Sequence, residues 1–139
     1  MKILKNLAVL ALAAVLVTGL AACDRNNPLE NVTDAPTDAK ADTSLDAITQ
    51  AILAAGNERG WQKTLKSPGL IRAKLITGEG KHVVEVDIAY SRDEFSITYA
   101  DSFNMNYQLR DGEPRIHPKY NRWVQILKDD IQQSIKNLS

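Results

Sequence analysis

An alternation of apolar and polar side chains between residues 71 and 109 most constrains how this chain can fold. A period of two is typical of β-strands that bury one face and expose the other. The alternation occurs in four runs, which cover residues 71–75, 84–90, 95–99 and 103–109. It therefore predicts an antiparallel sheet of three strands, with a fourth that is short or continuous with the third.

Two segments with helical periodicity flank these strands. The first covers about residues 44–58, with Ser44 as a suitable N-cap and Asp46 in the first turn, where a negative charge favours the helix. The second follows Pro118 and carries an apolar stripe that extends to Leu138. We therefore expect an α+β fold, a two-layer sandwich in the order helix, three- or four-stranded antiparallel sheet, helix, with both helices on one sheet face.

Four charged residues on the first two strands have a structural explanation. Arg72 and Lys74 alternate with apolar residues on one strand, and Glu85 and Asp87 do so on the next. Opposite charges that face each other across a hairpin stabilise it by about 0.2–1 kcal/mol for each pair. We expect these four residues to form the polar face of the sheet.

Residues 1–22 have the layout of a secretory signal. Lys2 and Lys5 provide a positive start, and an unbroken apolar run follows from Leu7 to Val17. That run is shorter than the roughly 20 residues that span a bilayer. The alternatives are a weak transmembrane anchor or a buried core helix.

The sequence Leu20–Ala21–Ala22–Cys23 resembles the lipobox of bacterial lipoprotein precursors. The resemblance covers residues 1–23. It implies that Cys23 becomes the new N-terminus after cleavage and carries a thioether-linked diacylglycerol and an N-acyl chain. Two or more acyl chains hold a protein stably on a membrane, whereas one holds it only marginally. The alternative is a secreted protein with a spare thiol.

Asp24 follows the lipobox directly. In enteric lipoproteins, an aspartate at this place implies retention in the inner membrane. The resemblance therefore points to a periplasm-facing protein that is anchored to the inner membrane, with the outer membrane as the alternative.

Residues 24–44 have the composition of a disordered tether. The segment holds five acidic residues against Arg25 and Lys40, two prolines and no aromatic residue. Such a composition buries too little apolar surface to offset the entropy of the chain. We therefore expect a lipidated Cys23 with a tether over residues 23–44, followed by one globular domain over residues 45–139.

The globular part also resembles small lipoprotein domains of proteobacteria. The likeness lies in the sequences SPGLIRAKL, KHVVEVDIAYS and IHPKYNRWVQIL, within residues 48–131. It implies a single folded module and adds no site.

The sequence RIHPKYNRW, residues 115–123, is the densest stretch of aromatic and basic side chains. Arg115, His117, Lys119 and Arg122 are candidates for binding a partner. Tyr120 and Trp123 fall on the apolar stripe of the last helix, which favours a structural role for both.

The sequence contains no pattern that indicates a catalytic or metal centre. It has one cysteine and two histidines, His82 and His117, and lacks the HExxH, CxxC and GxSxG motifs. A Ser102–His117–Asp101 triad lacks the context of a nucleophile elbow. We therefore predict no catalytic residue, no metal and no cofactor.

The most direct functional hypothesis is a non-enzymatic binding or assembly module that is anchored in the cell envelope by Cys23. Its partner would be an envelope protein or another envelope component. The 17 basic and 17 acidic residues give no reason to expect nucleic acid. The alternative is a small hydrolase or ligand-binding module that uses loop 110–119 or the polar sheet face. A homodimer through a sheet edge is a further hypothesis.

Overall fold

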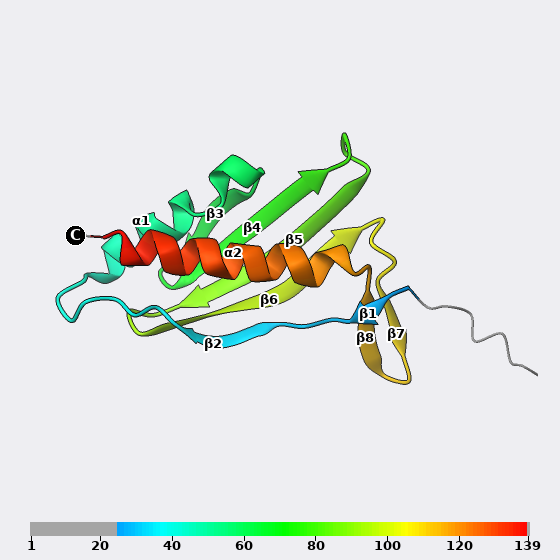
Figure 1. The fold of residues 1–139 in the computed structure, drawn as a ribbon, viewed down its shortest axis with the longest axis horizontal. Coiled ribbons are helices and arrows are strands. Elements are labelled where there is room, and N and C mark those ends of the chain that lie inside the picture. The colour runs from blue at the N-terminus through cyan, green and yellow to red at the C-terminus, as the bar shows by residue number, and fades with distance from the viewer. Residues whose placement is uncertain (1–24, 139) are drawn as a thin grey trace, which may run out of the picture.

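The computed structural model describes residues 25–138, so the predicted signal peptide, Cys23 and Asp24 lie outside the described residues. The described part contains two α-helices and two antiparallel sheets, which confirms the α+β class (Figure 1). The helices are α1 (Leu45–Ala54) and α2 (Lys119–Lys136), and a short 3-10 turn covers Asn57–Arg59. The strands are β1 (Asn27–Pro28), β2 (Val32–Pro36), β3 (Gln62–Ser67), β4 (Leu70–Thr77), β5 (His82–Tyr90), β6 (Glu94–Phe103), β7 (Gln108–Arg110) and β8 (Glu113–Ile116).

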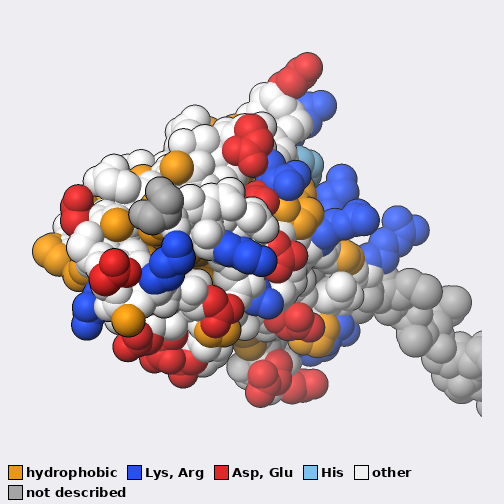
Figure 2. Space-filling view, turned by 60° about the vertical axis from the view of Figure 1, so that its left-hand side comes forward, with side chains coloured by type: hydrophobic (Ala, Val, Ile, Leu, Met, Phe, Trp, Pro, Cys, Tyr) orange, Lys and Arg blue, Asp and Glu red, His pale blue; other side chains and the backbone are white. Residues whose placement is uncertain are grey.

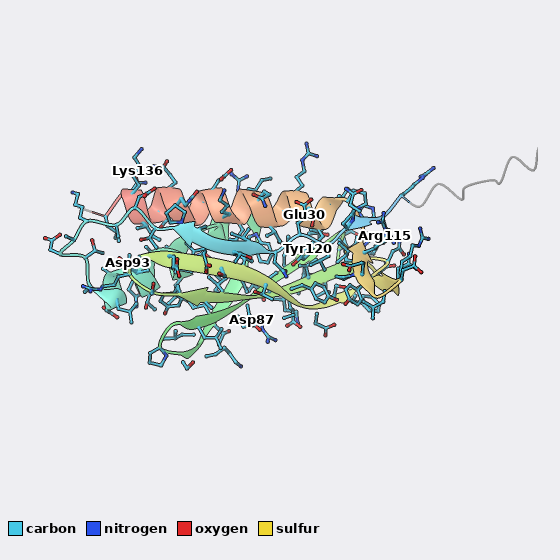
Figure 3. The ribbon with its side chains drawn as sticks, turned by 90° about the horizontal axis from the view of Figure 1, so that it is seen from below. Glu30, Asp87, Asp93, Arg115, Tyr120 and Lys136 are labelled. Atoms are coloured by element: carbon cyan, nitrogen blue, oxygen red, sulfur yellow. The ribbon has the colours of Figure 1, made fainter. Side chains whose placement is uncertain are left out.

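Strands β4, β5 and β6 form the centre of a five-stranded sheet with the order β2-β6-β5-β4-β3. They confirm the three strands predicted from the alternation. Arg72 lies directly opposite Asp87 in the register of β4 and β5, and its Nε is 2.6 Å from the carboxylate Oδ1. The predicted charge pairing across this hairpin is therefore present at this position. Asp87 lies on the side of the sheet away from α2 (Figure 3).

The fourth alternating run, residues 103–109, does not form one strand. Asn104 and Asn106 have positive φ angles of 57° and 53°, which turn the chain out of the extended conformation. The chain then enters β7, which pairs with β8 in a separate three-stranded sheet of order β1-β8-β7.

The structure contradicts the predicted disorder over residues 25–44, the part of the predicted tether that it describes. β2 adds an outer strand to the large sheet through pairs such as Val32 with Ile97 and Ala35 with Phe95. Val32 and Ala35 are both buried. This strand needs few apolar residues of its own, because it packs on a core that the rest of the domain supplies. The register shifts between Val32 and Ala35, so the segment has no alternation for sequence analysis to detect.

Shortening Val32 tests whether this segment is folded. The change Val32→Ala removes two buried carbon atoms and is expected to lower the free energy of unfolding by about 1.5 kcal/mol, measured by urea denaturation. Thr33→Ala, at an exposed position on the same strand, should leave stability unchanged. Equal stability of both variants and the unmodified protein would contradict the folded assignment.

Both predicted helices are present, although α1 is shorter than expected. The Ser44 Oγ accepts a hydrogen bond from the Ala47 N–H at 3.1 Å, which confirms the predicted N-cap. The helix ends at Ala54 because Gly56 takes a left-handed conformation, with φ of 73°. A side chain on Gly56 would also lie 3.0 Å from the ring of Trp61, which is buried.

Helix α2 lies across the large sheet (Figure 1) and packs against it with an apolar stripe. The buried residues of the stripe are Tyr120, Val124, Leu127, Ile131 and Ile135. The two helices also contact each other, since the Ser134 hydroxyl donates a hydrogen bond to the Ala51 carbonyl at 2.8 Å. None of the helices between residues 25 and 138 has both the length and the apolar character needed to cross a membrane.

Candidate functional site

Two adjoining cavities form a groove between the start of α2 and strands β4 and β5. Their volumes are about 270 and 260 Å³, and Thr77 and Trp123 line both. We call this combined feature the α2 groove. The first cavity is also lined by Gly78, His82, Met105, His117 and Lys119, and the second by Arg59, Trp61, Leu75 and Ile126.

His82 stands at the start of β5, where the turn from β4 positions its ring. A Cβ on Gly78 would lie 3.2 Å from the His82 Cδ2, so a glycine at this turn lets the imidazole pack closely. The Nδ1 of His82 is 2.8 Å from the Asn104 carbonyl, and the Asn104 amide in turn donates to the Lys81 carbonyl at 2.9 Å. Because a carbonyl only accepts, the His82 Nδ1 carries the proton, and in the neutral ring Nε2 is an acceptor.

In the neutral form, His117 has the opposite tautomer to His82. Its Nδ1 accepts a hydrogen bond from the Lys119 backbone N–H at 3.1 Å, so in the neutral ring Nε2 carries the proton. Its own backbone N–H donates to the Met105 carbonyl at 2.8 Å, which fixes the loop before α2. Burial, the Lys119 ammonium and His82 together lower the pKa of His117. The first cavity of the groove therefore offers one imidazole acceptor, one imidazole donor and one ammonium group.

The walls of the groove are aromatic and apolar. Trp61 is almost fully buried and Trp123 is partly exposed, and Met105 closes the end near the histidines. The sequence places Trp123 on the core stripe of α2, and in the structure it packs against the core while its exposed part lines the groove. Figure 2 shows apolar and basic side chains beside a histidine on one side of the molecule.

The structure separates the four candidate partner-binding residues. His117 and Lys119 both line the α2 groove. Arg115 is partly buried on β8, and its Nη2 donates to the Asn26 carbonyl at 2.6 Å, so it holds the N-terminal segment. Arg122 is exposed on α2 and does not line either cavity of the groove.

The sequence did not predict that His82 and Trp61 line the same groove as His117. The turn at Gly78 and the hydrogen bond from His82 to Asn104 bring His82 to the groove, and neither contact leaves a local pattern in the sequence. The glycines at 78 and 80 are the one signal that a tight turn precedes His82.

The residues of the imagined catalytic triad have other partners. The Ser102 hydroxyl lies 2.8 Å from the Tyr99 hydroxyl, and the Ser102 N–H donates to the Asp101 carboxylate. The Nδ1 of His117 is occupied by the Lys119 N–H, where a triad would place its carboxylate. Within residues 25–138, no group of three or more His, Cys, Asp or Glu side chains is placed to hold a metal ion.

No known protein family, curated protein or solved structure matches this chain.

The pKa of His117 gives a test of the groove geometry. We expect its imidazole to titrate below the usual value of about 6.5, because burial and the Lys119 charge disfavour the imidazolium. The change Lys119→Met should raise this pKa, whereas Arg122→Met should not, and ¹H–¹³C NMR titration measures both. Since the unfolded chain takes up this proton first, His117 lowers stability as the pH falls below about 6.5. An identical titration in both variants would contradict the placement of Lys119.

Proposed function

We propose that this protein is a lipid-anchored component of the bacterial cell envelope that binds a partner in the α2 groove and catalyses no reaction. The observation that carries the binding role is the groove itself. It combines the partly exposed Trp123 with the imidazoles of His82 and His117 and the ammonium of Lys119. An apolar cleft with a small number of convergent polar groups is typical of a binding site.

The lipid attachment rests on the resemblance of residues 20–23 to a lipobox. Cleavage before Cys23 and acylation of its sulfur and amine would hold the domain on the membrane, facing the periplasm. Asp24 favours the inner membrane as the place of retention, with the outer membrane as the alternative.

The chemistry of the groove favours a partner that presents an apolar ring beside a carboxylate. The Lys119 ammonium is a cationic donor for the carboxylate, and the His117 Nε2–H is a neutral one. Trp123 and Met105 provide apolar contact for the ring. The groove therefore suits a few side chains of an acidic, aromatic protein segment.

We also propose that both helices cover the same face of the five-stranded sheet, as in the expected two-layer sandwich. The Thr49 hydroxyl of α1 is 2.7 Å from the hydroxyl of Tyr90, which lies on the buried face of β5. Helix α2 buries its stripe above the same strands, and Figure 3 places Tyr120 between α2 and the sheet. The opposite, polar face then stays in water.

Small probes test the ligand chemistry. Phenylacetate carries an aromatic ring and a carboxylate, and phenylethylamine carries the same ring with a positive charge. We expect phenylacetate to shift the NMR resonances of the His82 and His117 rings and phenylethylamine to leave them unchanged. Equal shifts with both probes, or none with either, would contradict the proposed recognition of a carboxylate.

Cross-linking in living cells tests whether the occupant is a protein. A photoreactive residue at Ile126, which lines the second cavity of the groove and leaves Lys119 in place, should form an adduct with one envelope protein. The same residue at Gln125, which is exposed on α2 and lines neither cavity, is the matched control. Phenylacetate binding without any groove-specific adduct would favour the alternative, a small-ligand module that uses His117 and Lys119 of the 110–119 loop.

A further inference from the structure

The described part of the chain is already folded at Asn26, close in sequence to the predicted lipid attachment site. Asn26 is only 7% exposed, and its side-chain amide donates to the Asn106 carbonyl at 2.9 Å. The Asn26 carbonyl accepts from Arg115, and β1 begins at the next residue. Only Asp24 and Arg25 separate Asn26 from Cys23.

This short separation limits how far the domain can be from the bilayer. The three Cα–Cα steps from Cys23 to Asn26 can reach at most about 11 Å. A tether over residues 24–44 would have allowed roughly 25 Å of root-mean-square reach. A lipid on Cys23 therefore places the three-stranded sheet β1-β8-β7 next to the lipid head groups.

The end of the molecule that holds this sheet exposes large apolar side chains. Strands β1, β7 and β8 lie together at the end where residue 25 is found (Figures 1 and 3). Leu109 on β7 is 65% exposed, and Tyr107, the residue before β7, is 42% exposed. Among residues 25–138, Leu109 has the greatest exposed fraction of any large hydrophobic side chain. Tyrosine and leucine side chains are suited to the boundary between head groups and acyl chains.

The charges at this end are compatible with an anionic membrane. Arg25 is exposed and lies two residues from Cys23, and Figure 2 shows basic side chains gathered at this end. Asp111 and Glu113 are exposed at the turn of the β7–β8 hairpin and oppose this attraction. The contact therefore depends mainly on the exposed apolar side chains and on the nearby anchor.

We infer that the β7–β8 hairpin rests on the bilayer that holds Cys23, with Leu109 inserted at the interface. This inference rests on the lipid anchor of the proposed function. A face that is already held at the membrane surface inserts without a further loss of translational freedom. The apolar contacts of one leucine and one tyrosine are then enough to hold the hairpin in the interface. Because β8 leads directly into α2, the Lys119 end of the α2 groove lies close to the same surface.

A fluorophore at position 109 tests the inference in the full, lipidated protein. The protein is reconstituted into vesicles of phosphatidylethanolamine and phosphatidylglycerol, and an environment-sensitive probe is attached to Leu109→Cys. The thioether on Cys23 does not react with the label. Leu65→Cys is the matched control, because Leu65 is 45% exposed on the outer strand β3 of the other sheet. Mass spectrometry confirms lipidation of both variants.

We expect the probe at position 109 to shift to shorter wavelength and to lose most of its emission when nitroxide lipids are added. The probe at position 65 should show neither the shift in wavelength nor the loss of emission with nitroxide lipids. A lipidated protein in which neither probe is quenched overturns the inference and leaves the anchor intact. A shift at position 109 without quenching by nitroxide lipids means that protein covers this face, which also overturns it. A chain without lipid on Cys23 overturns both the anchor and the inference.

Discussion

The change Tyr120→Ala is expected to lower the free energy of unfolding by about 3–5 kcal/mol. Tyr120 is fully buried in α2, and its ring meets the ring of Tyr99 edge to face, with centroids 5.7 Å apart. Tyr99 is in turn stacked on Tyr107 at 4.6 Å. Truncation leaves a cavity between the helix and the sheet, at the point where the aromatic side chains meet. Urea denaturation at neutral pH measures the loss.

The variant Tyr120→Phe separates the contribution of the ring from that of the hydroxyl. The Tyr120 hydroxyl is buried without a hydrogen-bond partner among residues 25–138, and burial raises its pKa well above the usual value. Removing this unsatisfied group is expected to leave stability unchanged or to raise it by about 1 kcal/mol. A Phe variant as unstable as the Ala variant would show that the hydroxyl has a partner and that this description of the core is wrong.

Loss of the lipid attachment is expected to release the protein from membranes completely. The cleanest test replaces residues 1–22 with a secretory signal that is cleaved without lipidation and introduces Cys23→Ser. Because the proposed lipid on Cys23 is what holds the domain, the domain without it should appear in the periplasmic fraction. Membrane fractionation after a carbonate wash measures this.

The matched control for this experiment is Asp24→Ser in the natural precursor, which should stay on membranes because Cys23 is unchanged. A Cys23→Ser protein that still sediments with washed membranes would mean that a surface of the protein, and not the lipid, holds it there.

The central strands and the last helix could be predicted because their side-chain pattern is set by packing. Strands β4, β5 and β6 each bury alternate residues, and α2 buries one every three or four residues. The same reasoning predicted the opposition of Arg72 and Asp87 across a hairpin. In these elements, local periodicity and burial agree.

The N-terminal strands could not be predicted for a physical reason. A strand at the edge of a sheet needs backbone hydrogen bonds and only a few buried side chains. β2 buries Val32 and Ala35, which are three residues apart, and Asp34 between them has a positive φ of 49°. This irregularity removes the alternation, so the acidic and proline-containing composition suggested disorder.

The candidate site depended on contacts between distant parts of the chain. His82 reaches the groove through a turn that contains two left-handed glycines and through the carbonyl of Asn104, whose φ is 57°. His117 is placed by its backbone bond to Met105. These backbone contacts depend on conformation more than on residue type. The sequence therefore predicted His117 and Lys119 as candidates but not the cavity that they line.

Mass spectrometry of the mature protein purified from its own cells tests the proposed lipid attachment at Cys23. We expect an N-terminal Cys23 that carries a diacylglycerol on sulfur and an acyl chain on its amine, with Asp24 as the second residue. A mature protein that retains residues 1–22, or one in which Cys23 has a free thiol, would contradict it.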